Sequence, residues 1–188
     1  MTQGDQNSWI LYTNEMLHGG LEQLPDNWYE VRARWFLQKG WTQLRLSWEM
    51  LRRPSDVLFV PAHVLPRVIP KKTVVTVHDV GFHRFPHLYK ARDRQFHEIS
   101  TKDIAKKASR VATVSEFSGR EIAECYGIPP EKIAITPNGV DHDVYRPISD
   151  QQALDERLSR YRLNRPYFIT IGRLEAKKNT VNLIKAFS

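Results

Sequence analysis

The sequence predicts an α/β protein in which a Rossmann-like parallel sheet is flanked by helices, and three observations support this fold class. Short runs rich in β-branched residues alternate with stretches of helical periodicity, which is the pattern of strands joined by crossover helices. Several of these runs are apolar on both faces, as buried parallel strands are. The composition, with 41% hydrophobic and 26% charged residues in a chain of 188, is typical of a globular protein.

Six runs are predicted to be strands of this sheet. In chain order they are residues 10–12, 57–60, 73–77, 111–114, 133–136 and 167–171. Between the first two runs, Trp41, Leu44, Trp48 and Leu51 recur at helical spacing. We therefore expect a helix that turns these four side chains toward the core and ends before Pro54.

Two more helices are predicted between the later strands. A charged helix covers residues 94–109, and the next begins at a capping box formed by Ser118 and Glu121 and ends at Gly127. Cys125 lies within the second helical pattern. Because it is the one cysteine of the chain and forms no internal disulfide, we interpret it as a packing residue rather than a nucleophile.

The length of the chain limits its domain organisation, because 188 residues bury one sizeable core but not two. We assign residues 1–148 to an N-terminal domain and residues 149–165 to a junction with a polar helical segment. Residues 166–188 then read as the start of a second Rossmann-like domain.

The formal charge of +7 predicts an affinity for anionic groups. The basic residues are spread along the chain, which favours a solvated surface first and contact with an anionic membrane next; nucleic acid is not an expected partner. No apolar run reaches the length of about 20 residues that spans a bilayer, and the first residues lack a leader pattern. The expected location is the cytoplasm, with peripheral contact at the inner membrane face.

Polar or flexible residues follow four of the predicted strands. They are His78-Asp79, Ser115-Glu116, Asn138-Gly139 and Gly172-Arg173. Because open α/β sheets bind ligands at the carboxyl ends of their strands, these residues are the candidate site. Asn138-Gly139 reads either as a tight turn with positive φ or as a loop whose backbone approaches a ligand closely.

The segment from Gly172 onward contains the most specific candidate motif for ligand binding. Arg173 and Lys178 stand between a predicted strand and a helix whose expected cap is Asn179. Two cations beside the free amide groups of a helix N-terminus suit a diphosphate, although a solvated loop is the alternative. The chain has neither a dinucleotide fingerprint nor a P-loop pattern.

The histidines allow two kinds of site. After a central strand, His78 could bond a sugar hydroxyl or hold a proton, or it could be structural. His83, His87 and His97 invite a metal interpretation, but no cysteine or carboxylate cluster completes a ligand set, so no metal is expected. Ser115 lacks a nucleophile-elbow sequence and is expected to bond backbone groups at a turn.

Taken together, four segments resemble the retaining glycosyltransferases of family 4. They are PSDVLFVPAHVLP, TVVTVHDVGFHRFP, RVATVSEFSGREIAECYGIPPEKIAITPNGVD and YFITIGRLEAKKNTVNLIKAF. The resemblance implies a GT-B fold, in which two Rossmann-like domains face each other across a cleft. In such enzymes the first domain binds mainly the acceptor and the second mainly the sugar nucleotide.

The same resemblance implies roles for individual residues. Arg173 and Lys178 would clamp the donor diphosphate and replace a metal ion, and His78 would lie near the transferred sugar. The residues implied to line the cleft are Asp79, Asn138, Gly139 and Gly172. The implied reaction transfers a hexose such as mannose, with retained configuration, from a GDP- or UDP-linked donor to a glycan or lipid-linked acceptor in polysaccharide biosynthesis; no cofactor is expected.

Two departures from the family pattern limit what the chain is expected to do alone. The usual first strand with its glycine-rich loop is missing before NSWILYTNE, and the chain stops inside the first helix of the donor domain. Turnover by these residues alone is therefore not expected. The alternative hypothesis is a non-catalytic module that holds an acidic glycan, a lipid headgroup or RNA on its basic surface.

Overall fold

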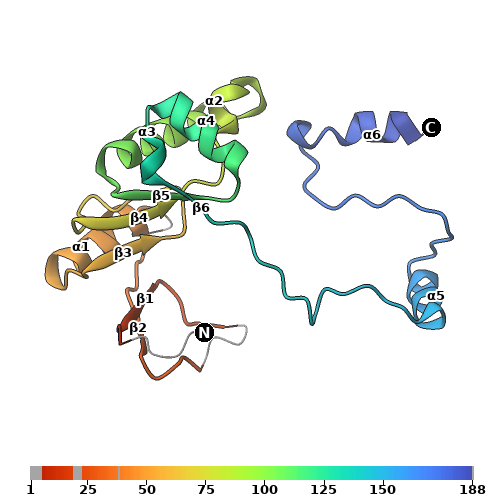
Figure 1. Ribbon diagram of the computed structural model, residues 1–188, viewed down its shortest axis with the longest axis horizontal. Helices are drawn as coiled ribbons and strands as arrows, with labels where there is room; N and C mark the ends of the chain where they lie inside the picture. The colour runs from red at the N-terminus through yellow and green to blue at the C-terminus, as the bar shows by residue number, and fades with distance from the viewer. Residues whose placement is uncertain (1–5, 19–22, 38, 188) are drawn as a thin grey trace. The chain divides into compact units, whose positions relative to one another are not determined.

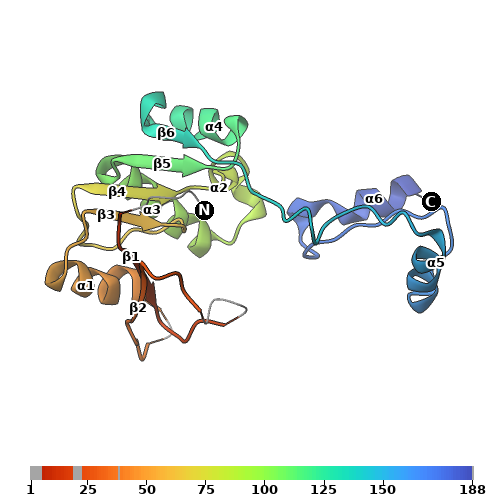
Figure 2. The ribbon, with the colours of Figure 1, turned by 60° about the horizontal axis from the view of Figure 1, so that its bottom comes forward.

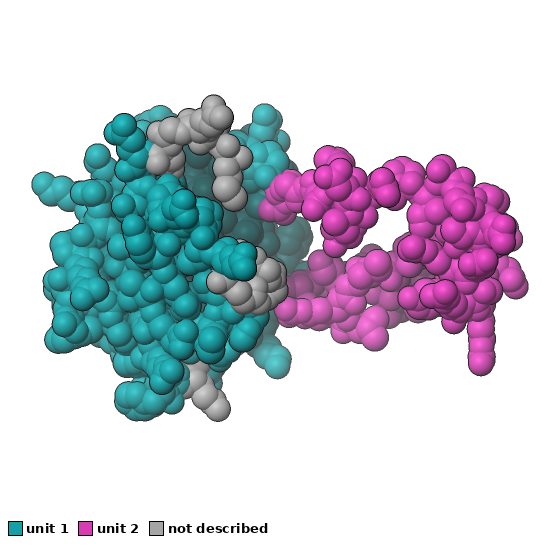
Figure 3. Space-filling model, turned by 90° about the horizontal axis from the view of Figure 1, so that it is seen from below, with its two compact units in different colours: residues 1–137 teal, residues 138–188 magenta. Residues whose placement is uncertain are grey.

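The computed structural model describes residues 6–18, 23–37 and 39–187, which form two compact units. Unit 1 comprises residues 1–137 and unit 2 residues 138–188 (Figure 3). Unit 1 combines parallel strands with flanking helices, so the predicted α/β fold class is confirmed. The assignment of domains at residues 149 and 166 stays a prediction.

A four-stranded parallel sheet forms the centre of unit 1 (Figure 1). Its strands are β3 (Val57–Val60), β4 (Lys72–Thr76), β5 (Arg110–Thr113) and β6 (Ile133–Ile135), and they lie side by side in chain order. Four predicted strands are thereby confirmed, three of them with ends shifted by one residue. Parallel neighbours in chain order require crossover connections, which the helices supply.

Helices α2 (Gly81–Arg84), α3 (Ala91–Lys107) and α4 (Glu116–Tyr126) gather along one face of this sheet (Figure 1). The core between helices and sheet contains Val75, Val77, Val111, Ile104 and Ile122, each at most 1% exposed. Burying an aliphatic side chain of this size contributes about 1.5–3 kcal/mol, so this layer fixes where each strand ends.

The first predicted helix forms, but it buries a different face. A π-helical turn (Trp41–Arg45) precedes α1 (Leu46–Arg52), and the amide of Leu46 bonds to the carbonyl oxygen of Trp41. This wider turn shifts the helical register. Leu46 and Met50 are therefore only 5% and 3% exposed. Leu44, Trp48 and Leu51 are 42%, 54% and 61% exposed, so the predicted core role of these three is wrong.

The first predicted strand belongs to a separate sheet. Strand β1 (Trp9–Thr13) pairs in parallel with β2 (Trp28–Arg32), and Trp9 stacks on Trp28 with ring centroids 5.3 Å apart. Strand β2 was not predicted, because Glu30 and Arg32 interrupt its apolar residues and leave no β-branched run. Figure 2 shows the two sheets as distinct ribbons within unit 1.

Helix α4 starts one turn earlier than predicted. Its cap is Ser115, whose Oγ accepts a hydrogen bond of 3.1 Å from the amide of Ser118. The predicted capping box of Ser118 and Glu121 is wrong, because Glu121 binds Arg84 instead. The role expected for Ser115, bonding backbone groups at a turn, is confirmed.

The predicted end of α4 at Gly127 is confirmed, and it gives a testable expectation. Gly127 has φ 63° and ψ 30°, its amide bonds to Ala123, and a Cβ added there would meet nothing within 4 Å. The change Gly127→Ala should therefore lower the free energy of unfolding by about 1–2 kcal/mol through backbone strain alone. Urea unfolding measures this loss of free energy. The change Gly127→Asn should lower the free energy of unfolding less than Gly127→Ala does, and equal losses in the two variants would contradict backbone strain as the cause.

Unit 2 contains α5 (Gln151–Arg160), a 3-10 turn (Ala176–Lys178) and α6 (Thr180–Phe187). The predicted polar helix near residue 150 is confirmed, with Asp150 accepting from the amide of Ala153 at 3.1 Å. The predicted strand at 167–171 is wrong, because these residues find no partner strand among the described residues of unit 2. No helix in the described ranges has the length and apolar character to cross a membrane.

Candidate functional site

The carboxyl end of β4 places His78 and Asp79 at the surface of unit 1. Just before them, the amide of Val77 bonds to the carbonyl oxygen of Ala112 at 2.9 Å, which continues the ladder to β5. The hydroxyl of Thr113 donates to the carbonyl oxygen of His78 at 3.4 Å. The backbone of His78 is thus anchored to the neighbouring strand while its side chain stays exposed.

Asp79 shapes the turn that follows. Its Oδ1 accepts a hydrogen bond of 2.8 Å from the amide of Gly81, which starts helix α2. A Cβ added to Gly81 would lie 2.9 Å from the hydroxyl oxygen of Tyr89 and 3.1 Å from Oδ1 of Asp79. Glycine is required here by this close packing, and one oxygen of Asp79 is committed to holding the turn.

Sequence reasoning missed His63, which joins this cluster from the loop after β3. Its Nε2 lies 2.5 Å from the hydroxyl oxygen of Thr101, and that hydroxyl donates to the carbonyl oxygen of His97 at 2.8 Å. Because a hydroxyl has a single hydrogen, Nε2 of His63 is the donor in its bond to Thr101. The sequence does contain a signal for His63, because it follows β3 in the segment VPAH. Val60 of β3 pairs with Val75 of β4, and His63 and His78 each lie three residues beyond that pair.

The electrostatics of His63 show which groups surround it. Burial lowers the pKa of His63 to about 4, helped by His97 and His78 and opposed by the carboxylate of Asp79. The side chains of His97, His78 and Asp79 therefore lie near the imidazole of His63. At neutral pH the imidazole of His63 is uncharged and acts as a fixed hydrogen-bond donor.

His97 completes the cluster from helix α3. Its ring stacks on Phe82 at 5.1 Å and lies 5.4 Å from the ring of His63, and its Nδ1 is buried without a hydrogen-bond partner. His83 is instead bound to Glu98 at 2.8 Å. Within the described ranges no three metal-ligating side chains converge, and the expectation of a metal-free reaction stays a prediction.

A cavity of about 150 Å³ opens beside Asp79, between α2 and the first turn of α4. Phe85 and Phe117, exposed at 55% and 66%, form its apolar walls. Arg84 bonds Glu121 at 3.0 Å on its rim, and this bond lowers the pKa of the Glu121 carboxyl. An apolar wall with a carboxylate at the edge suits the faces and hydroxyls of a sugar.

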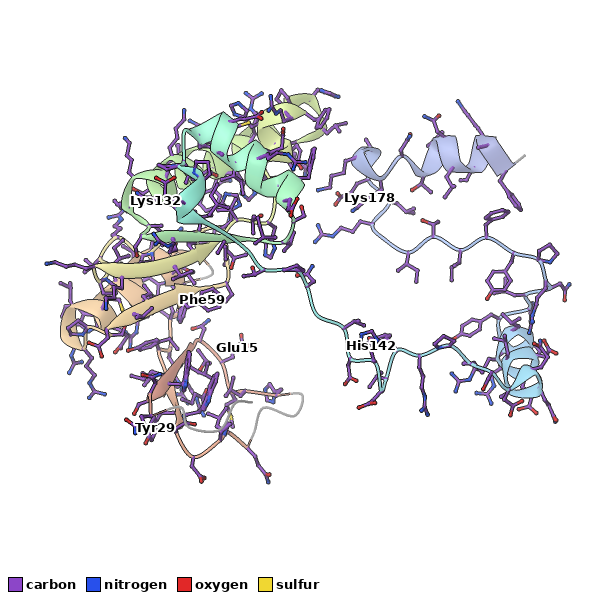
Figure 4. The ribbon with its side chains drawn as sticks, viewed as in Figure 1. Glu15, Tyr29, Phe59, Lys132, His142 and Lys178 are labelled. Atoms are coloured by element: carbon purple, nitrogen blue, oxygen red, sulfur yellow. The ribbon has the colours of Figure 1, made fainter. Side chains whose placement is uncertain are left out.

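In unit 2, Arg173 and Lys178 are both exposed and precede helix α6 in the chain. Figure 4 shows Lys178 on the segment that leads into α6. Arg173 Nη1 is 3.3 Å from Glu175 Oε1, and Lys177 Nζ is 3.2 Å from Oε2; the bond to Lys177, followed by that to Arg173, lowers the pKa of Glu175. The amides of Asn182 and Leu183 bond to Asn179, so α6 begins directly after these cations.

Three further predicted cleft residues also belong to unit 2. Asn138, Gly139 and Gly172 are exposed, and a Cβ at Gly139 would meet nothing within 4 Å. Neither Asn138 nor Gly139 has a positive φ, so the interpretation as a positive-φ turn is wrong, whereas the interpretation as a ligand-contacting loop stays a prediction. His78 and Asp79 belong to unit 1, so the gathering of both sets around one ligand also stays a prediction.

Comparison with known proteins gives two matches. The sequence profile of Glycosyltransferase Family 4 matches residues 18–144, more than half of the chain and all strands of the main sheet. The O-antigen chain mannosyltransferase B of Escherichia coli is 29% identical over 145 residues. That alignment covers 76% of this chain and 37% of the relative, so the chain spans little more than a third of the relative's length.

Proposed function

Because the chain belongs to glycosyltransferase family 4, we propose that it serves the transfer of a hexose from a sugar nucleotide to a glycan or lipid-linked acceptor. The observation that carries this proposal is the cluster at the carboxyl ends of β3 and β4. There an exposed histidine and carboxylate, His78 and Asp79, lie near the donor His63, beside a small cavity with aromatic walls. Ligands of open α/β sheets bind at this edge.

The proposed donor is a GDP- or UDP-linked hexose, with mannose first among the candidates. The name of the Escherichia coli relative, an O-antigen chain mannosyltransferase, supports both mannose and a role in polysaccharide biosynthesis. The family match at residues 18–144 lies largely in unit 1, so it bears more on the acceptor side than on the proposed donor-binding residues of unit 2.

The proposed reaction keeps the anomeric configuration. The bond between the anomeric carbon and the diphosphate oxygen breaks, and its electron pair stays on the departing diphosphate. The acceptor hydroxyl oxygen forms the new bond on the same face and passes its proton to that diphosphate. Arg173 and Lys178 would stabilise the charge that develops on the leaving group, the role that a metal ion has in other transferases.

On the acceptor side, His78 is proposed to bond a hydroxyl of the transferred sugar or of the acceptor. Its backbone is anchored through Thr113, and its exposed imidazole is free to rotate toward a ligand. The free carboxylate oxygen of Asp79 and the loop at Asn138 and Gly139 would bind further hydroxyls. Peripheral contact with the inner face of a membrane is also proposed, supported by the formal charge of +7.

A product assay tests this function on the chain and, where the reading frame extends past Ser188, on the longer chain that it encodes. With GDP- and UDP-hexoses and a lipid-linked acceptor, the longer chain should release nucleoside diphosphate and form a glycoside with the anomeric configuration of the donor. The change His78→Ala should lower the rate about 5–150-fold, because a bound hydroxyl that loses its hydrogen-bond partner costs about 1–3 kcal/mol.

The exposed His142 provides the matched control, and His142→Ala should leave the rate unchanged. Equal activity of His78→Ala and the wild type would contradict the role of His78. Absence of product from every donor would favour the alternative, a non-catalytic module that uses the basic surface to hold an acidic glycan. That module should lose its ligand as salt is raised.

A further inference from the structure

A groove of about 530 Å³ runs between helix α3 and the loop that follows β3. The loop is fixed on both sides. The amide of Arg67 bonds to Oγ of Ser47 at 2.8 Å, and the hydroxyl of Ser100 donates to the carbonyl oxygen of His63 at 2.6 Å. The groove is therefore a preformed feature of unit 1.

The floor of this groove exposes large apolar side chains. On α3, Phe96 and Ile99 are 46% and 62% exposed and contribute to the groove together with Val64 and Leu65 of the loop. The core-facing side of α3 is already filled by Thr101, Ile104 and the following Ala108. Phe96 and Ile99, three residues apart, thus form an additional apolar stripe on the outer face of the helix.

The rim of the same groove is basic. Arg67, Lys102, Lys106 and Lys107 border it, against one carboxylate, Asp103, which is paired with Lys107 at 2.8 Å. Cations around exposed apolar side chains are typical of surfaces that lie in a membrane interface, where apolar groups enter the acyl boundary and basic groups meet anionic headgroups. A nucleic acid would use the cations but not the aliphatic floor.

We propose that the α3 groove, defined by Phe96, Ile99, Arg67, Lys102 and Lys106, docks unit 1 on an anionic lipid bilayer. This inference rests on the membrane contact proposed above and assigns it to one surface. The aromatic ring and the isoleucine enter the headgroup boundary, and the three cations bind lipid phosphates. Docking of this kind brings the carboxyl ends of β3 and β4 to the membrane surface, where a lipid-linked acceptor is found.

Vesicle flotation with the full chain tests the proposal. The wild type should float with vesicles that contain phosphatidylglycerol and remain unbound with phosphatidylcholine alone. The double change Phe96→Ser and Ile99→Ser should weaken binding at least about tenfold, because the inserted apolar area is lost. The double change Lys102→Glu and Lys106→Glu should weaken it at least about 30-fold, at roughly fivefold for each basic residue.

Matched controls come from unit 2. Val140→Ser with Val144→Ser removes two exposed apolar side chains, and Arg157→Glu with Arg160→Glu changes the net charge as much as the lysine variant does. Both should bind like the wild type. If the wild type does not float with either kind of vesicle, the membrane contact itself is overturned. If the variant with Phe96→Ser and Ile99→Ser floats as well as the wild type, only the assigned surface is overturned. Weakening by the Arg157 and Arg160 variant to the same degree would show a net-charge effect and likewise overturn the assignment.

Discussion

Removal of the guanidinium at position 173 should reduce hexose transfer about 10²–10³-fold, the effect of deleting one group that stabilises transition-state charge. The expected loss is in kcat as well as kcat/KM, because the diphosphate gains charge as the glycosidic bond breaks. Arg173→Lys should keep part of the activity, since an ammonium supplies the charge but not the two-pronged geometry. The assay compares these variants in the longer chain, where the reading frame extends past Ser188.

The fold of unit 2 should not change in Arg173→Ala. The side chain of Arg173 is 84% exposed, and its partner Glu175 keeps its bond to Lys177 at 3.2 Å. Exposed ion pairs of this kind contribute little to stability. Arg146→Ala removes another exposed arginine of the same unit and should be fully active. Full activity of Arg173→Ala would rule out the proposed diphosphate clamp, whatever the donor sugar is.

The strands of the main sheet were predictable because each carries its own local signal. Parallel strands buried on both faces need uncharged residues in succession, as in β5, where Val111, Ala112 and Thr113 are all buried, and such runs are visible in the sequence. The exposed edge after β4 was equally visible, since His78 and Asp79 interrupt the apolar run. The end of α4 at Gly127 was predictable because the left-handed backbone at that position favours glycine.

The features that were missed depend on interactions between distant residues. The π-helical turn before α1 changes which side chains meet the core, and a simple count of apolar spacing contains no information about it. The residues 167–171 have strand-like composition but lack a neighbouring strand in unit 2. His63 joins the site only because Thr101 of α3 holds its ring, a contact between residues 38 positions apart.

Acid should destabilise unit 1 between about pH 6.5 and pH 4, and His63 should account for up to about 3 kcal/mol of that loss. The pKa of His63 is about 4 in the folded chain, against an ordinary value of 6.5. Between these values the unfolded chain binds a proton at this position that the folded chain does not bind. The free energy of unfolding therefore falls as the pH is lowered through this range, and the effect is complete below pH 4.

The carboxylates affect the free energy of unfolding at lower pH than His63 does, so the two contributions can be measured separately. The Tyr126 and His83 hydrogen bonds lower the pKa of Glu98 against the opposing effect of burial, and Arg84 lowers that of Glu121. A lowered carboxyl pKa stabilises the fold above the ordinary value of 4.5 and loses this contribution as the pH falls below it. The interval from pH 6.5 to 4.5 thus separates the contribution of His63 from that of these two carboxylates.

Urea unfolding at a series of pH values, followed by tryptophan fluorescence, measures this effect. All five tryptophans lie between residues 9 and 48, so the signal reports unit 1. The change His63→Gln keeps an N–H donor for Thr101 and removes the titrating group, so its stability should be nearly constant from pH 6.5 to 4.5. His87→Gln, a change at an exposed histidine, should behave like the wild type. If His63→Gln lost stability as steeply as the wild type when the pH is lowered, the buried neutral imidazole would not be the source of the acid sensitivity. That result would also contradict the role of His63 as a fixed hydrogen-bond donor near His78 and Asp79.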